Sequence, residues 1–121
     1  LAAVLGHVYP IFHNFKGGKG AGTLVGIIIA LFPECFLYIL LVWLTSLVLT
    51  GYVGLSTVLG GFSLIIFTYF KYPLGIFSAF GYFTLLVGLF LIFTHRSNFK
   101  RMMNRNENRF EKIMIFKRLF R

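Results

Sequence analysis

Acidic residues are nearly absent from this sequence, which contains no aspartate and only three acidic residues. They are Glu34, Glu107 and Glu111. The lack of aspartate excludes Asp-dependent catalytic triads and EF-hand calcium loops. A single cysteine, Cys35, excludes an internal disulfide and a thiolate metal cluster. We therefore expect no metal site of these kinds.

Long apolar segments dominate what is present. Hydrophobic residues make up 58% of the 121 residues, and the mean hydropathy is +0.84. Between positions 24 and 94, only Glu34 and Lys71 are ionised at neutral pH. This composition excludes an ordinary soluble domain and a disordered chain. It predicts an all-α, polytopic integral membrane bundle that forms a single membrane domain over residues 1–121.

Polar breaks divide the apolar stretch into four expected membrane segments. The breaks are Pro33-Glu34, the stretch 50–54 and Lys71-Tyr72-Pro73. The first segment is short, because ten helical residues rise only ~15 Å, and we expect a half-helix or a tilted segment packed against protein. The alternative is one long tilted span over 23–50. The expected segments are 23–32, 34–50, 54–70 and 74–94.

Basic residues are concentrated near the end of the chain. Lysine and arginine number 12 against 3 acids, a net charge of +9, and nine of the twelve lie between Arg96 and Arg121. The positive-inside rule places that tail in the cytoplasm. Counting back through four segments places the Lys16–Lys19 loop on the same side. Since the charges flank apolar segments, anionic lipid or an anionic substrate is the expected partner, not nucleic acid.

The tail over 106–121 carries an amphipathic pattern. A helix there would place six apolar side chains near one face, which predicts an interfacial helix on anionic lipid. The alternative is a solvated charged tail. The six are Phe110, Ile113, Met114, Phe116, Leu119 and Phe120.

A loop rich in glycine and lysine precedes the first full apolar segment. Four glycines and two lysines fall within the seven residues 16–22. Glycine lets successive N–H groups turn toward one anion, and lysine neutralises a phosphate, so the loop is a candidate phosphate cradle. Thr23 would cap the next helix or add a hydroxyl donor. The loop is not a Walker A loop, because Lys19 is followed by Gly20 and not by serine or threonine. The alternative is a flexible cytoplasmic turn.

A second polar segment begins where the last apolar segment ends. If it is helical, His95, Asn98 and Met102 share one face. His95 would accept a proton or donate to a phosphate, and Asn98 would orient a hydroxyl or an acyl oxygen. Glu107 is expected to pair with a lysine or arginine and hold the loop closed. The alternative is a stop-transfer charge cluster, which explains the basic residues alone.

Together, the two segments resemble two conserved motifs of the PlsY family, the bacterial acyl-phosphate:glycerol-3-phosphate acyltransferases. The order of the motifs and the membrane segments between them also match. The residues that carry the resemblance are Gly6-His7-x-Tyr9-Pro10-x-Phe12 with Phe15-Lys16-Gly17-Gly18-Lys19-Gly20, and His95-Arg96-x-Asn98-x-x-Arg101 with Glu107.

The resemblance implies a multi-pass protein of the bacterial inner membrane with a cytoplasm-facing active site. The implied reaction moves an acyl group from acyl phosphate to the sn-1 hydroxyl of glycerol 3-phosphate, in the first step of phospholipid biosynthesis, and gives lysophosphatidic acid and phosphate. No cofactor is implied, and we expect a monomer in contact with membrane lipids. His95, Asn98 and Glu107 become catalytic candidates. The substrate-binding candidates are His7, Lys16, Gly17, Gly18, Lys19, Gly20, Thr23, Arg96 and Arg101.

The sequence also departs from the family pattern. The first family motif, a Ser-Gly-Asn-rich loop, is absent, so the chain is expected to be the C-terminal part of such a protein, without its N-terminal helices. Arg105 stands where the family has glycine, and Gly51 stands where arginine usually precedes the tyrosine. Two alternatives stay open. One is a catalytically inactive membrane protein that binds anionic lipid or acyl phosphate, and the other is an organic-anion transporter subunit.

Overall fold

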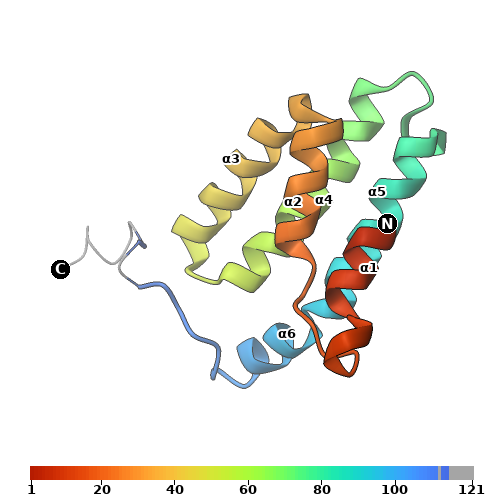
Figure 1. The fold of residues 1–121 in the computed structure, drawn as a ribbon. Helices are drawn as coiled ribbons and strands as arrows, with labels where there is room; N and C mark the ends of the chain where they lie inside the picture. Colours follow the sequence, from red (N-terminus) through yellow and green to blue (C-terminus); the bar gives the residue numbers. More distant parts are fainter. Residues whose placement is uncertain (112, 115–121) are drawn as a thin grey trace.

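The protein is all-helical over the residues that the structure describes. The computed structural model describes residues 1–111, 113 and 114, and no strand occurs among them. Figure 1 shows the helices in chain order. They are α1 (Ala2–Val8), η1 (Ile11–His13), α2 (Ala21–Leu31), α3 (Pro33–Thr50), α4 (Val53–Lys71), η2 (Gly75–Phe77), α5 (Ala79–Thr94) and α6 (Arg96–Met103), where η denotes a 3-10 helix.

Local chemistry sets the helix boundaries close to the expected ones. Pro33 occupies the first turn of α3, where its missing N–H costs no hydrogen bond. Gly51 ends α3 with φ of +74°, a conformation that glycine adopts without strain. Ser78 caps α5 by accepting a hydrogen bond from the Gly81 N–H at 2.9 Å. The hairpin of α2 and α3 shows that the alternative of one span over 23–50 is wrong (Figure 1).

Glycines let the central helices approach one another. A Cβ atom on Gly61 would lie 2.5 Å from the Leu91 Cδ1 atom of α5. A Cβ atom on Gly60 would lie 3.4 Å from the Ile39 Cγ2 atom of α3. These contacts agree with the small residues commonly found where helices meet in membranes. The buried cluster around these contacts consists of Leu24, Ile28, Cys35, Leu64, Phe80, Val87 and Leu91.

Small polar residues inside the bundle satisfy their own hydrogen bonds. Thr68 is fully buried and its hydroxyl donates to the Leu64 carbonyl at 2.8 Å. Thr84 is also fully buried and donates to the Gly81 carbonyl at 2.8 Å. Such bonds within one helix remove the cost of an unsatisfied hydroxyl in an apolar setting.

Among the described residues, two helices are long and apolar enough to cross a membrane. These are α3, with 18 residues, and α4, with 19 residues, each with a mean hydropathy of 1.8. The pair α5 and α6 counts as a third span if taken together, although the two helices meet at a bend of 49°. The 11 residues of α2 fall short of a span, as the sequence indicated.

The two ends of the bundle differ in polarity. Figure 1 shows the 9–20 loop, the α3–α4 turn and α6 at one end, which we call the basic end. The break between α2 and α3 and the α4–α5 connection lie at the other end. There, the Tyr72 hydroxyl donates to the Glu34 carboxylate at 2.9 Å. The Lys16–Lys19 loop and the basic segment that begins at Arg96 therefore lie at the same end. Counting back through four membrane segments predicted this arrangement.

The tail differs from the expected helix. Residues 106–111, 113 and 114 form turns and irregular chain, and the other residues of the predicted helix lie outside the described residues. Instead of continuing as a helix, the described tail returns to the bundle. The Phe110 N–H donates to the Gly51 carbonyl at 2.9 Å, next to the α3–α4 turn.

Replacing Gly81 with alanine should destabilise the bundle. The added Cβ would lie 2.4 Å from the Ile76 carbonyl oxygen, a backbone atom that cannot rotate away. We expect Gly81→Ala to cost about 1–3 kcal/mol, the range for overpacking, and to lower Tm in detergent. The control is Gly26→Ala in α2, where no atom lies within 4 Å of the new Cβ. Equal Tm values for the two variants would contradict this packing.

Candidate functional site

The glycine-lysine loop folds back on the end of α1. The Gly17 N–H donates to the Val8 carbonyl at 3.1 Å, and the Gly18 N–H donates to the His7 carbonyl at 3.3 Å. A Cβ atom on Gly17 would lie 2.0 Å from the His7 carbonyl oxygen, so only glycine fits there. In this structure both amides donate to α1 carbonyls, and their contact with a phosphate stays a prediction. They are used to hold the loop in place.

The other glycines of the loop also have packing roles. A Cβ atom on Gly18 would lie 2.4 Å from the His7 imidazole Nε2, so His7 supports the loop from α1. Gly20, with φ of +80°, is the N-cap of α2, and a Cβ there would lie 2.8 Å from Val4. Thr23 lies inside α2 and does not cap it, because the cap is Gly20 and α2 has no side-chain cap bond. A contact of the Thr23 hydroxyl with substrate stays a prediction.

The start of α2 adds donors next to Lys19. The first backbone hydrogen bond of this helix runs from the Leu24 N–H to the Gly20 carbonyl. The N–H groups of residues 21–23 precede that bond and have no carbonyl partner within the helix. Together with the helix dipole, they favour an anion at this position.

Lys19 and α6 are joined by a chain of side-chain hydrogen bonds, which we call the Lys19–Glu107 network. The Lys19 Nζ donates to the Asn98 Oδ1. The Asn98 Nδ2 donates to the Glu107 Oε1 at 2.6 Å, and the Arg101 Nε donates to the Glu107 Oε2 at 2.6 Å. The pairing of Glu107 with a basic residue was predicted, and it is present as an Arg101 ion pair. Two segments 79 residues apart thus form one site.

A glycine of α4 lets the network sit close to the bundle. Asn98 is only 7% exposed. A Cβ atom on Gly54 would lie 2.8 Å from the Asn98 Cγ atom, so the start of α4 leaves room for the amide. The Glu107 side chain is 9% exposed, whereas that of Arg101 is 48% exposed. The network therefore has a buried amide at its centre and an accessible guanidinium at its edge.

His95 lies at the bend between α5 and α6 and is 4% exposed. Its Nδ1 lies 3.0 Å from the Leu91 carbonyl and 3.2 Å from the Thr94 hydroxyl. Because a carbonyl only accepts hydrogen bonds, Nδ1 carries the proton in this contact, and Nε2 is left as the acceptor of a neutral ring. A role of His95 with substrate stays a prediction.

The electrostatics of the network favour an added anion. Partial burial lowers the pKa of Lys19 from its usual range, and the positive charge of Arg101 lowers it further, against an opposing effect of Glu107. The hydrogen bond from Arg101 lowers the pKa of Glu107, and the bond from Asn98 adds to this, while partial desolvation opposes it. One carboxylate thus faces two cations, and a bound phosphate would relieve their repulsion.

The remaining basic candidates lie outside this network. Arg96 turns back to α5, where its Nη1 donates to the Phe93 carbonyl at 2.7 Å and its guanidinium lies 4.2 Å from the Phe93 ring centroid. Lys16 is exposed on the loop. Their contact with substrate stays a prediction. Among the described residues, no group of three His, Cys, Asp or Glu side chains is placed to hold a metal ion.

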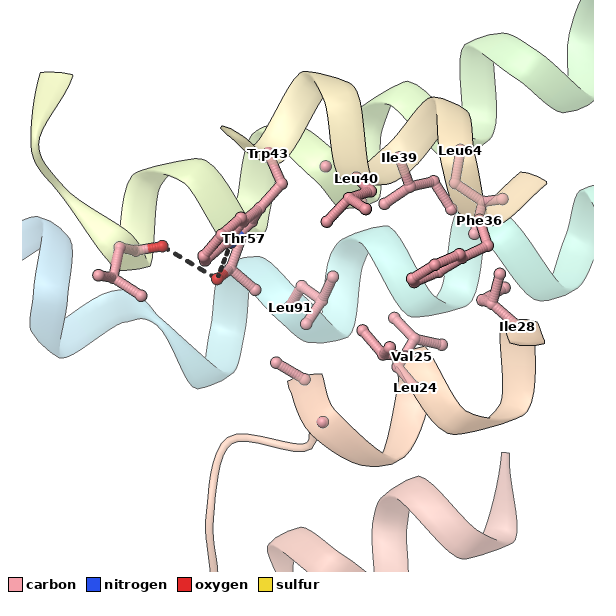
Figure 2. A pocket seen from close by; sticks show the side chains of 15 residues that line it. Leu24, Val25, Ile28, Phe36, Ile39, Leu40, Trp43, Thr57, Leu64 and Leu91 are labelled. Atoms are coloured by element: carbon pink, nitrogen blue, oxygen red, sulfur yellow. Dashed lines mark hydrogen bonds between the residues drawn. The ribbon is translucent and has the colours of Figure 1, made fainter. Parts of the chain in front are cut away.

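An apolar pocket of about 450 Å³ lies between α2, α3 and α4. Figure 2 shows side chains from these helices converging on it, with Leu91 of α5 among them. Ala21 and Gly22 line it at the start of α2, two to three residues from Lys19. The Trp43 Nε1 donates to the Thr57 hydroxyl at 3.3 Å, also at its wall (Figure 2). No local sequence pattern predicts this pocket, because segments far apart in the chain form it.

The glycerol-3-phosphate acyltransferase family model matches residues 1–105. The chain belongs to this family. Among its relatives, the glycerol-3-phosphate acyltransferase of Aquifex aeolicus is 36% identical over 111 residues, which are 91% of this chain and 56% of that protein. The protein of the same name from Bacillus subtilis is 37% identical over 105 residues, 87% of this chain and 52% of that protein. The chain thus spans about half the length of these curated relatives.

Solved structures of the family share the fold. Two crystal structures of PlsY (YgiH), an integral membrane glycerol 3-phosphate acyltransferase, match with a TM-score of 0.80. The glycerol 3-phosphate form is 33% identical and the match covers 99% of this chain and 57% of that chain. The lysophosphatidic acid form is 32% identical, and the match covers 99% of this chain and 58% of that chain. The predicted PlsY-family resemblance is confirmed, and with it an integral membrane fold.

Arg105 marks a departure from the family pattern that the structure explains. Its φ of +57° is left-handed, a region that costs an ordinary side chain roughly 1–2 kcal/mol and glycine almost nothing. The chain turns there, just after α6, and brings Glu107 back to Asn98. Glycine would adopt this turn without strain, which agrees with the glycine that the resemblance led us to expect, whereas Arg105 adopts it under strain.

Glu107 should make stability depend on pH in the acid range. Because its pKa is lowered on folding, its contribution is fully present above the ordinary value of about 4.3 and is lost as the pH falls through the lowered value. At pH 7, Glu107→Gln should therefore melt at a lower Tm than the wild type. The gap in Tm between the two proteins should narrow as the pH falls below about 4. A gap that is constant with pH would contradict the network.

Proposed function

We propose that this chain supplies part of the active site of an acyl-phosphate:glycerol-3-phosphate acyltransferase. The reaction transfers an acyl group from acyl phosphate to the sn-1 hydroxyl of glycerol 3-phosphate, giving lysophosphatidic acid and phosphate. The observation that carries the proposal is the Lys19–Glu107 network, which joins the two polar segments beside an apolar pocket. Membership of the family supports it, as do the two similar structures, which are of glycerol 3-phosphate and lysophosphatidic acid forms of PlsY.

The network is suited to phosphate. Lys19 and Arg101 are two cations that share one carboxylate, and the free amides at the start of α2 lie next to Lys19 along the chain. A phosphate placed there would accept hydrogen bonds from both kinds of donor. Asn98 stands between them, where its amide can orient the glycerol hydroxyl or the acyl oxygen.

The chemistry requires positioning and charge stabilisation. Acyl phosphate is a mixed anhydride, so its phosphate is a good leaving group and a covalent acyl-enzyme is not needed. The sn-1 hydroxyl oxygen attacks the acyl carbon, the bond from that carbon to the phosphate oxygen breaks, and inorganic phosphate leaves. Aligned reactants and fixed positive charge supply much of the rate in such a step. The hydroxyl proton passes to a side chain or to a phosphate of the substrates.

The apolar pocket is suited to the acyl chain. Its wall is apolar apart from the Thr57 hydroxyl, which is already engaged with Trp43 and Val53. Its end at Ala21 and Gly22 adjoins the donors at the start of α2. An acyl chain lying in the pocket would therefore present its phosphate end to Lys19. This arrangement matches a substrate with one charged end and one long apolar end.

The orientation in the membrane follows from charge. The basic end carries both lysines of the loop and the arginines of α6, and the positive-inside rule places this end in the cytoplasm. The active site would then face the cytoplasm of a bacterial inner membrane, where glycerol 3-phosphate is soluble and the acyl product stays in the lipid. The protein would act as a monomer.

Lys19→Ala should impair glycerol 3-phosphate acylation in the protein expressed from its whole reading frame. Loss of a charged hydrogen bond to phosphate costs about 1.5–3 kcal/mol, so KM should rise roughly 10- to 150-fold or turnover should be lost. The measurement is transfer of a labelled glycerol 3-phosphate into lipid with acyl phosphate as donor. The matched control is Lys71→Ala at the opposite end, which should change KM less than about twofold.

Two outcomes would contradict this function. An unchanged rate for Lys19→Ala would remove Lys19 from the phosphate site. A folded wild-type protein that transfers no label would favour the inactive, lipid-binding alternative.

A further inference from the structure

A short segment after α6 carries Glu107 to the network. We call residues 104–110 the C-terminal strap. It contains no helix, and Figure 1 shows it leaving α6 and running toward the turn between α3 and α4. Two contacts fix its far end on that turn. The Phe110 N–H donates to the Gly51 carbonyl at 2.9 Å, and the Arg109 guanidinium lies 4.6 Å from the ring centroid of Tyr52.

We infer that Arg109 and Tyr52 are positioning residues, which anchor the C-terminal strap on the α3–α4 turn and so hold Glu107 against Asn98. Neither residue was a candidate in the sequence, because the two lie 57 positions apart in unrelated segments. The catalytic part of this inference rests on the proposed function. The anchoring itself does not.

The Arg101–Glu107 ion pair alone cannot hold Glu107 in a fixed position relative to the bundle. Arg101 and Glu107 are six residues apart and belong to α6 and the strap, which are consecutive in the chain. Their pair can move as a unit with the end of α6. Gly51 and Tyr52 instead belong to the connection between α3 and α4, two helices packed along their lengths. A strap fixed to that connection is fixed to the bundle.

The orientation of Asn98 passes this constraint to Lys19. The Asn98 Nδ2 donates to Glu107, which forces the Oδ1 atom to the other side of the amide, where it accepts from Lys19. Without the carboxylate, only the bond from Lys19 would orient the amide, because an ammonium donates and does not accept. Losing the anchor should therefore disturb Lys19 through Glu107 and Asn98.

The contact between Arg109 and Tyr52 is of a kind that can hold the strap in place. A guanidinium over a tyrosine ring at 4.6 Å is within the range of cation–π attraction. Tyr52 is half-buried, so its ring is held, whereas Arg109 is exposed and reaches over it. Met114 covers the same turn, since a Cβ atom on Gly51 would lie 2.9 Å from its Sδ. The strap and the turn thus fit closely.

The test compares two disruptive variants with two conservative ones. Arg109→Ala and Tyr52→Leu remove the contact, whereas Arg109→Lys keeps the charge and Tyr52→Phe keeps the ring. In the full-length protein, we expect each disruptive variant to lower acyltransferase kcat by about two- to fivefold, the factor that one partly exposed cation–π contact represents. The conservative variants should stay within about twofold of the wild type. Loss of activity in Tyr52→Phe equal to that in Tyr52→Leu would overturn the inference.

Coupling to Glu107 separates positioning from general stability. In a Glu107→Ala background, Arg109→Ala should cause no further loss of kcat, because the strap then has nothing to position. A merely structural role would give the same fold-loss in both backgrounds, and that result would overturn the inference.

Hydrogen–deuterium exchange of the strap tests the anchoring without any activity. We expect peptides covering 104–110 to exchange faster in Arg109→Ala and Tyr52→Leu, and at the wild-type rate in the two conservative variants. Unchanged exchange in both disruptive variants would overturn the anchor. If the wild-type protein proves inactive, the proposed function fails, and the exchange result alone decides the anchor.

Discussion

The site depends on one amide, the side chain of Asn98. It accepts from Lys19 on the loop before α2 and donates to Glu107 beyond α6, so it bridges segments that enter and leave the bundle at separate points. Both bonds require α6 to lie close to the start of α4. Gly54 allows this approach, because any side chain there would meet the amide. The bend at His95 directs α6 across the basic end and places Asn98 over that glycine.

The membrane setting explains why the polar and apolar parts of the site adjoin. Inside the bundle, buried hydroxyls bond to their own helices, and the pocket between α2, α3 and α4 is almost wholly apolar. Ionised groups are left at the helix ends, where water and headgroups solvate them. The short helix α2 begins at the junction of the two regions. A substrate with a phosphate at one end and a hydrocarbon chain at the other fits such a junction.

Local patterns in the sequence predicted the helices and the two polar segments well. Pro33, Gly51 and Lys71 each mark a break that depends only on neighbouring residues, and the structure ends helices within a few residues of them. The pairing of Glu107 with a basic residue followed from their proximity in the chain. Contacts between distant segments could not be predicted in this way. Gly17 and Gly18 donate to carbonyls of α1, and the strap returns to Tyr52. Both contacts depend on the folded positions of other helices.

The central claim is that Asn98 holds Lys19 in place through their hydrogen bond, so that the two residues act as one unit when glycerol 3-phosphate binds. The most direct test is a double-mutant cycle on the Kd of glycerol 3-phosphate, measured by calorimetry with the full-length protein, Lys19→Met, Asn98→Ala and the double variant. Residues in one hydrogen-bond network show coupling of about 0.5–3 kcal/mol, so we predict that the double variant binds little worse than the weaker single variant. Additive losses in the double variant, or a Kd that neither change affects, would contradict the account.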